Sequence, residues 1–121
     1  MNFDNSRESL LSLLTGRELS AITFVRDYLQ LQFDGPFINA YVWPLIRMPE
    51  KKIDFGAPGY RDALCGQIGK TVIAAREEPE IKLAIDFNNA IVFEISLKRE
   101  DRITEEAAMF QDGTGKRWNV W

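Results

Sequence analysis

Two neighbouring stretches, 80–87 and 90–98, constrain the fold more than any other part of the sequence. In both, large apolar residues alternate with polar or small ones. A period of two puts successive side chains on opposite faces of a strand, so both stretches are predicted to be strands with one buried face. The alternating apolar residues are Ile81, Leu83, Ile85, Phe87, Ile91, Phe93, Ile95 and Leu97.

The turn between these strands can be derived from the side chains that must share a face. A three-residue loop over 87–89 pairs Ile85 with Ile91 and puts every large aliphatic side chain on one face, whereas a two-residue loop divides them between two faces. Such a loop needs a left-handed residue, which Asn89 tolerates. The corresponding three-residue loop in the first half ends at Gly35. We therefore expect positive φ at both positions, and we expect Asn89→Gly to be tolerated.

The remaining elements follow from the same reasoning about periodicity and breakers. Pro44 should disturb the last hydrogen bonds of the strand that contains it. Residues 47–59 carry two prolines and two glycines among charges, so we expect a long connection there, either mobile or held to the body by Ile53 and Phe55. The other predicted strands are 18–26, 28–33, 37–46, 71–77 and 116–121, and the predicted helices are 5–15, 60–68 and a short one over 104–110.

These elements predict a single α+β domain over residues 1–121. Its core would be one mainly antiparallel sheet of six or seven strands with helices 5–15 and 60–68 on one face. Two stretches, 5–46 and 60–98, run in the same order of helix, glycine and three strands at an offset of 53 or 54 residues, followed by an extension, 99–121. Either the chain contains an internal αβββ duplication, or two ordinary stretches resemble each other by chance.

The residue types that are missing exclude several activities. The chain has no histidine and only one cysteine, Cys65. These counts exclude Ser-His-Asp and Cys-His nucleophiles, His-ligated zinc, multi-cysteine metal sites and an intrachain disulfide. We expect Cys65 to be a small buried or half-buried residue. No cofactor is expected.

Charge and hydropathy narrow the partners. The net charge is −3, without the basic footprint of a nucleic-acid-binding protein. No window approaches the roughly 18 consecutive apolar residues of a membrane span, and the N-terminus does not resemble a signal peptide. We therefore expect a cytoplasmic protein that binds neither nucleic acid nor membrane. A free cysteine favours the same reducing compartment.

Two local motifs have ordinary explanations. Residues 66–71 end in Gly-Lys-Thr, but Leu64 stands where a phosphate-binding loop needs glycine, and the predicted order of elements is reversed. Glu77, Glu78 and Glu80 surround Pro79 and could bind a hard cation. A solvated hairpin turn is the simpler interpretation of these acids.

The surface most suited to binding is predicted around the 47–59 loop. Charged residues beside aromatic ones are typical of a binding rim. We expect Trp43 to pack into the core and Trp121 to lie at the surface. The candidate interaction residues are Trp43, Arg47, Lys51, Lys52, Phe55 and Trp121.

A family resemblance points to the same kind of function. The pattern Leu83-x-Ile85-x-Phe87-Asn88-Asn89-x-Ile91, the segment 105–110 and the terminal tryptophan resemble small bacterial α+β proteins of the immunity-protein type found in polymorphic toxin systems. The resemblance covers mainly residues 69–121. It implies a bacterial, cytoplasmic and non-catalytic protein that binds a partner.

Two functions remain open on the sequence. The first is a non-enzymatic module that binds a protein partner or forms a homodimer. The second is a small enzyme or ligand-binding protein that uses aspartate or glutamate in a cleft near the 47–59 loop.

Overall fold

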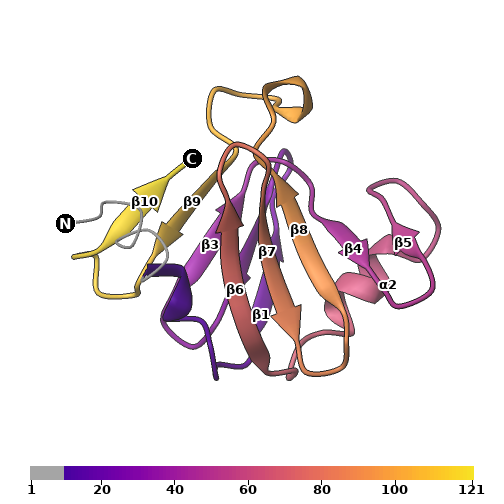
Figure 1. Ribbon diagram of the computed structural model, residues 1–121, viewed down its shortest axis with the longest axis horizontal. Helices are drawn as coiled ribbons and strands as arrows, with labels where there is room; N and C mark the ends of the chain where they lie inside the picture. The colour runs from indigo at the N-terminus through magenta and orange to yellow at the C-terminus, as the bar shows by residue number, and fades with distance from the viewer. Residues whose placement is uncertain (1–9) are drawn as a thin grey trace.

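The computed structural model describes residues 10–121 and is built mainly from two five-stranded antiparallel sheets (Figure 1). The first sheet has the order β1-β2-β3-β9-β10, with β1 (Ala21–Phe24), β2 (Leu29–Gln32), β3 (Phe37–Ala40), β9 (Ala108–Gln111) and β10 (Trp118–Val120). The second has the order β5-β4-β8-β7-β6, with β4 (Leu45–Arg47), β5 (Lys52–Ile53), β6 (Val72–Glu78), β7 (Lys82–Phe87) and β8 (Val92–Ser96). Besides the helical residues 10–12, the helical elements are the short α2 (Tyr60–Cys65) and η1 (Arg99–Asp101).

The predicted single sheet covered by helices on one face is therefore wrong. The two sheets cover each other, and their inner side chains form one core cluster with Leu11, Leu14 and Leu64 from residues 10–16 and α2. Leu83, Ile85, Phe93 and Ile95, which the alternation predicts to share a buried face, are buried in a cluster that also contains the inner residues of the first sheet. Half-buried strands need an apolar cover, and a second sheet supplies it as well as helices do.

Several element boundaries also differ from the prediction. The predicted strand 37–46 is divided into β3 and β4 because the chain bends over 41–44 and passes from the first sheet to the second. The predicted helix 104–110 is instead irregular chain followed by β9, since residues 108–111 pair with β3. The predicted connection 47–59 contains the end of β4 and all of β5. Of the predicted helix 5–15, residues 5–9 lie outside the described residues, and only 10–12 of the remainder are helical.

The two hairpin turns differ from each other and from the prediction. Between β7 and β8 the three-residue loop is 88–90, and the residue with positive φ is Ala90, at 67°, rather than Asn89. The loop lies one residue further along than expected, which keeps Ile85 and Phe93 paired on the inner face. Between β2 and β3 a two-residue loop places both Asp34, at 57°, and Gly35, at 123°, at positive φ. Positive φ at Gly35 is thus confirmed.

The two sheets join at a symmetric seam between residues 16–19 and 69–72. The Gly16 N–H donates to the Val72 carbonyl at 2.8 Å, and the Gly69 N–H donates to the Leu19 carbonyl at 2.7 Å. The two bonds are equivalent, because Gly69 lies 53 residues after Gly16 and Val72 lies 53 residues after Leu19. The same offset relates Glu18 to Thr71, which form a bridge between the two segments. A local two-fold axis through this bridge would relate the two hydrogen bonds to each other.

The chain exchanges hairpins across this pseudo-symmetry. Three consecutive strands, β1–β3 or β6–β8, form the main part of each sheet. The hairpin that follows β3, which is β4–β5, pairs with β8, and the hairpin that follows β8, which is β9–β10, pairs with β3 (Figure 1). Each sheet is thereby completed by the other half of the chain. Common ancestry of the halves stays a prediction.

Candidate functional site

The outer face of the second sheet carries an open groove with a volume of about 580 Å³. It lies over β4, β5, β7 and β8 and extends to the segment around η1. Its apolar lining comes from Val42, Trp43, Leu45, Ile81 and Ile103. Its charged lining consists of four cations and three carboxylates, which is a surplus of one positive charge in a chain whose net charge is −3.

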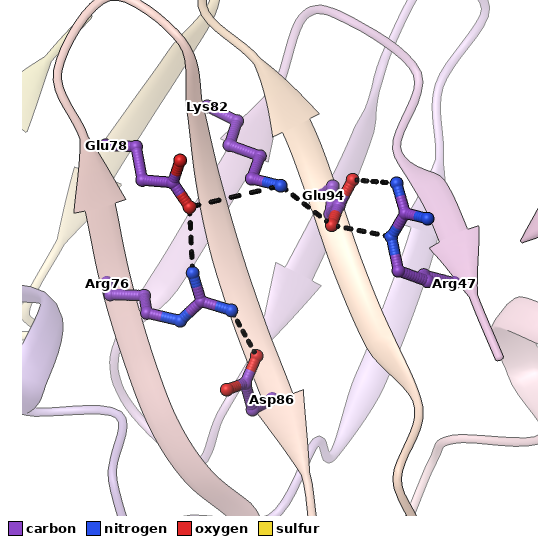
Figure 2. Close-up of polar contacts among 6 residues, drawn as sticks. All are labelled: Arg47, Arg76, Glu78, Lys82, Asp86 and Glu94. Atoms are coloured by element: carbon purple, nitrogen blue, oxygen red, sulfur yellow. Dashed lines mark hydrogen bonds and ion pairs between the residues drawn. The ribbon is translucent and has the colours of Figure 1, made fainter. Parts of the chain in front are cut away.

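Six charged side chains alternate in sign across the outer face of this sheet, and we call them the charged ladder (Figure 2). The register brings them together, because the pairing of β6, β7, β8 and β4 puts these residues on one face. The ladder contains three cations and three carboxylates, so its own charge is zero. It consists of Arg47, Arg76, Glu78, Lys82, Asp86 and Glu94, and its ion pairs are 2.9–3.9 Å long.

Glu94 is the most buried carboxylate of the ladder and lines the groove. Its side chain accepts from Arg47 Nε at 2.9 Å and Nη2 at 3.1 Å, and from Lys82 Nζ at 3.0 Å. The hydrogen bonds from Arg47 lower the pKa of the Glu94 carboxyl, and Lys82 acts in the same direction against the opposing effect of burial. The pKa of Arg47 is raised, mainly by its hydrogen bond to Glu94. A carboxylate held in this way stays ionised and is unsuited to act as a general acid.

Three aromatic rings in mutual contact hold the 47–59 segment against the body of the protein. The rings of Trp43 and Phe55 are 4.4 Å apart and nearly parallel, at 8°. Tyr60 packs edge-on against Phe55 at 5.8 Å and donates from its hydroxyl to the Pro44 carbonyl. Burial raises the pKa of Tyr60, with a further contribution from the charge of Asp54. Because Ile53 also packs against the core, the segment is held to the body rather than free.

The groove is bordered by exposed apolar side chains and by cations that have no acidic partner among the described residues. Ile81 is 48% exposed and Ile103 is 64% exposed. Phe55, which stacks on Trp43, is 53% exposed. Lys52 and Lys98 line the groove and form no ion pair within residues 10–121. Large exposed apolar groups beside unpaired charge are characteristic of binding surfaces.

Most of the predicted interaction residues lie together at this groove. Trp43, Arg47 and Lys52 line it, and Phe55 stacks on Trp43. Lys51 is exposed in the turn between β4 and β5.

Trp121 lies elsewhere, next to the first sheet. It follows β10, forms reciprocal backbone hydrogen bonds with Ala108 and packs, partly buried, against the core. Trp43 is also only partly buried. Cys65 is exposed, contrary to expectation.

Sequence reasoning missed the half of the groove that comes from distant strands. Ile81, Lys82, Glu94 and Ser96 come from β7, β8 and the turn before β7, about 40–50 residues from Trp43 in the chain. A signal was present, since Glu94 is a charged residue flanked by the apolar Phe93 and Ile95, where burial requires a partner.

The site offers little support for metal or acid–base chemistry. Within residues 10–121 no group of three or more His, Cys, Asp or Glu side chains could hold a metal ion. Of the three groove carboxylates, Glu94 is bound by two cations and Asp101 accepts from the Ser96 hydroxyl at 2.6 Å. Only the carboxylate of Asp54 is without a hydrogen-bond or ion-pair partner within the same residues.

Comparison of the chain with protein-family models, curated proteins and solved structures gave no match. No helix in the described part of the chain is long and apolar enough to cross a membrane.

Proposed function

We propose that this protein is a non-enzymatic binding module and that the groove on the second sheet binds an extended segment of a partner protein. The supporting observation is that the side chains of the groove fall into two groups, charges that are paired with one another and groups that are free to contact a partner. The ladder charges are largely neutralised by one another, while the apolar border is exposed and Lys52 and Lys98 have no ion-pair partner in the described part of the chain.

The chemistry of the free groups indicates the chemistry of the partner. Lys52 and Lys98 favour a carboxylate, and the surplus positive charge of the groove acts in the same direction. Trp43, Ile81 and Ile103 favour an aliphatic or aromatic side chain. We infer a segment that carries both acidic and large apolar residues. A bacterial, cytoplasmic immunity protein would be one instance of this function, and that assignment stays a prediction.

A small amphipathic anion is the second candidate ligand. A volume of about 580 Å³ falls within the range of about 300–1,000 Å³ typical of small-molecule sites. An enzyme is less favoured, because two of the three groove carboxylates already have partners.

A peptide-display library presented to the purified protein tests the proposal. We expect enrichment of sequences that combine acidic and large apolar residues. The double variant Lys52→Glu/Lys98→Glu should weaken binding of the enriched peptides at least about tenfold. The control Lys70→Glu/Lys116→Glu makes the same charge change at exposed positions away from the groove and should bind as the wild type does.

Two results would refute this function. One is a library without a consensus. The other is equal loss of binding in the groove variant and its control, since that would assign the effect to net charge alone.

A further inference from the structure

The pseudo-symmetry allows the outer faces of the two sheets to be compared position by position. Around the Glu18–Thr71 bridge, residues of β1 and β6 correspond at an offset of 53. The register carries the correspondence across each sheet. Asn39 pairs with Gln30 and Met109, just as Glu94 pairs with Ala84 and Leu45. Asn39 and Glu94 are also equally buried, each 8% exposed.

Every position of the charged ladder corresponds to an uncharged residue on the first sheet. Arg47, Arg76, Glu78, Lys82, Asp86 and Glu94 correspond, in the same order, to Gln111, Thr23, Val25, Tyr28, Gln32 and Asn39. The correspondence extends to the edge strands, where Lys52 of β5 matches Trp118 of β10. None of the residues that the register places on the outer face of the first sheet is charged.

Polar side chains on this face satisfy one another without charge. Gln32 donates to Gln30 at 2.8 Å, Gln30 donates to Asn39 at 2.8 Å, and Asn39 donates to the Tyr41 hydroxyl at 3.3 Å. Tyr41 packs against Tyr28 with ring centroids 5.3 Å apart. A row of mutually bonded amides can lose its water at much lower free-energy cost than a row of ions.

The aromatic content of the face is that of an interface core. Its large side chains are Tyr28, Phe37, Tyr41, Met109 and Trp118, and Trp118 is 59% exposed. Tyr, Trp, Phe and Met are enriched at the centres of protein interfaces, where Lys, Glu and Asp are depleted. The matched face of the second sheet, with the six ladder charges and Lys52, has the opposite composition.

We propose that the outer face of the first sheet binds the same face of a second copy of this chain, across a two-fold axis. The occupant follows from charge. An uncharged face offers nothing to attract a charged partner, but it can meet the same face of a second copy without burying any charge, whereas contact through the outer face of the second sheet would bury the ladder charges and Lys52. The groove is on the other sheet, so this dimer leaves the proposed binding surface free.

Self-association measured by sedimentation velocity over a series of concentrations tests the dimer. We expect the wild type to be a concentration-dependent dimer. In Thr23→Lys/Gln111→Lys, like charges are placed on both copies, and the dimer dissociation constant should rise about a hundredfold. The control Asn88→Lys/Thr104→Lys adds the same charge at exposed positions off the face and should dimerise normally.

A mixing experiment separates loss of the interface from loss of the fold. Copies with Thr23→Lys/Gln111→Lys should pair with copies carrying Thr23→Glu/Gln111→Glu, although neither dimerises alone. The groove variant Lys52→Glu/Lys98→Glu should stay dimeric, so failure of the proposed function is distinguishable from failure of this proposal. A wild type that is monomeric at every concentration overturns the dimer, as does a monomer that binds a neutral oligosaccharide on this face. Equal dissociation of the control variant would also overturn it.

Discussion

At the scale of single residues, the two most informative side chains are Asn39 and Glu94. They lie at corresponding places on the two sheets, with the same slight exposure. Asn39 needs only uncharged neighbours, whereas Glu94 needs two cations to stay ionised while largely buried. This one chemical difference is consistent with the different roles proposed for the two faces.

Glu94 should make stability depend on pH in a way that a variant can reveal. The folded state lowers the pKa of its carboxyl, so its contribution is present above the ordinary value of 4.5 and is lost as the pH falls through the folded pKa. Glu94→Gln should reduce the free energy of unfolding by about 1–3 kcal/mol at pH 7. The gap should narrow as the pH approaches 3. Urea denaturation of both proteins at several pH values measures it.

The control for this experiment is an exposed carboxylate. The side chain of Glu105 has no hydrogen-bond or ion-pair partner within residues 10–121. Glu105→Gln should stay within about 0.5 kcal/mol of the wild type. A Glu94→Gln gap that is unchanged between pH 7 and pH 3 would contradict the assigned role of the charge.

At the scale of elements, the turn between β7 and β8 provides a test of backbone conformation. Ala90 is held at positive φ, which costs a residue with a Cβ roughly 1 kcal/mol that glycine avoids. Ala90→Gly should therefore raise the free energy of unfolding by about 1 kcal/mol. Asn89→Gly should instead lower it by about 1–3 kcal/mol, because Asn89 exchanges two hydrogen bonds with the buried Gln67, at 2.9 and 3.1 Å.

These two substitutions also correct the expectation from sequence. The expected loop over 87–89 placed positive φ at Asn89, so glycine was expected to be tolerated there, whereas the observed positive φ is at Ala90. Thermal or urea unfolding of both variants distinguishes a loop over 87–89 from the observed loop over 88–90. Stabilisation by Asn89→Gly, with none by Ala90→Gly, would favour the loop over 87–89.

Strands were predictable from the sequence where the alternation of apolar and polar residues is enough to define them. Alternation defines β7 and β8, and their apolar positions are buried as expected, apart from the exposed Ile81 and the half-buried Ile91. Pairing partners lie beyond local pattern. Residues 105–109 favour a helix, yet residues 108–111 pair with β3 as a strand, because tertiary pairing outweighs weak propensity. The break at Pro44 was visible, but not the passage to a second sheet.

The same limit applies to the candidate site. Trp43, Arg47, Lys52 and Phe55 are close in sequence, so composition alone could group them. Glu94 and Lys82 join them only through the register of β4 with β8 and β8 with β7, which no local signal specifies.

At the scale of the whole molecule, the exchange of hairpins makes each sheet depend on both halves of the chain. Without β4–β5 the second sheet loses the strands beside β8, and without β9–β10 the first loses those beside β3. The apolar inner face of each sheet is covered by the other. A half that is expressed alone would expose both a sheet edge and this face to water.

We therefore expect the two halves to fold only together. A chain divided between Ala57 and Pro58 gives fragments 1–57 and 58–121, and neither should unfold cooperatively alone, whereas an equimolar mixture should recover the β-sheet circular dichroism and cooperative unfolding of the intact protein. Ile46, fully buried in β4 against β8, provides the decisive variant. Fragment 1–57 with Ile46→Lys should fail to restore folding, because a lysine there would be buried unpaired. The same fragment with Lys51→Glu, at an exposed position, should succeed. Cooperative unfolding of either fragment by itself would show that the halves are independent despite the exchanged hairpins.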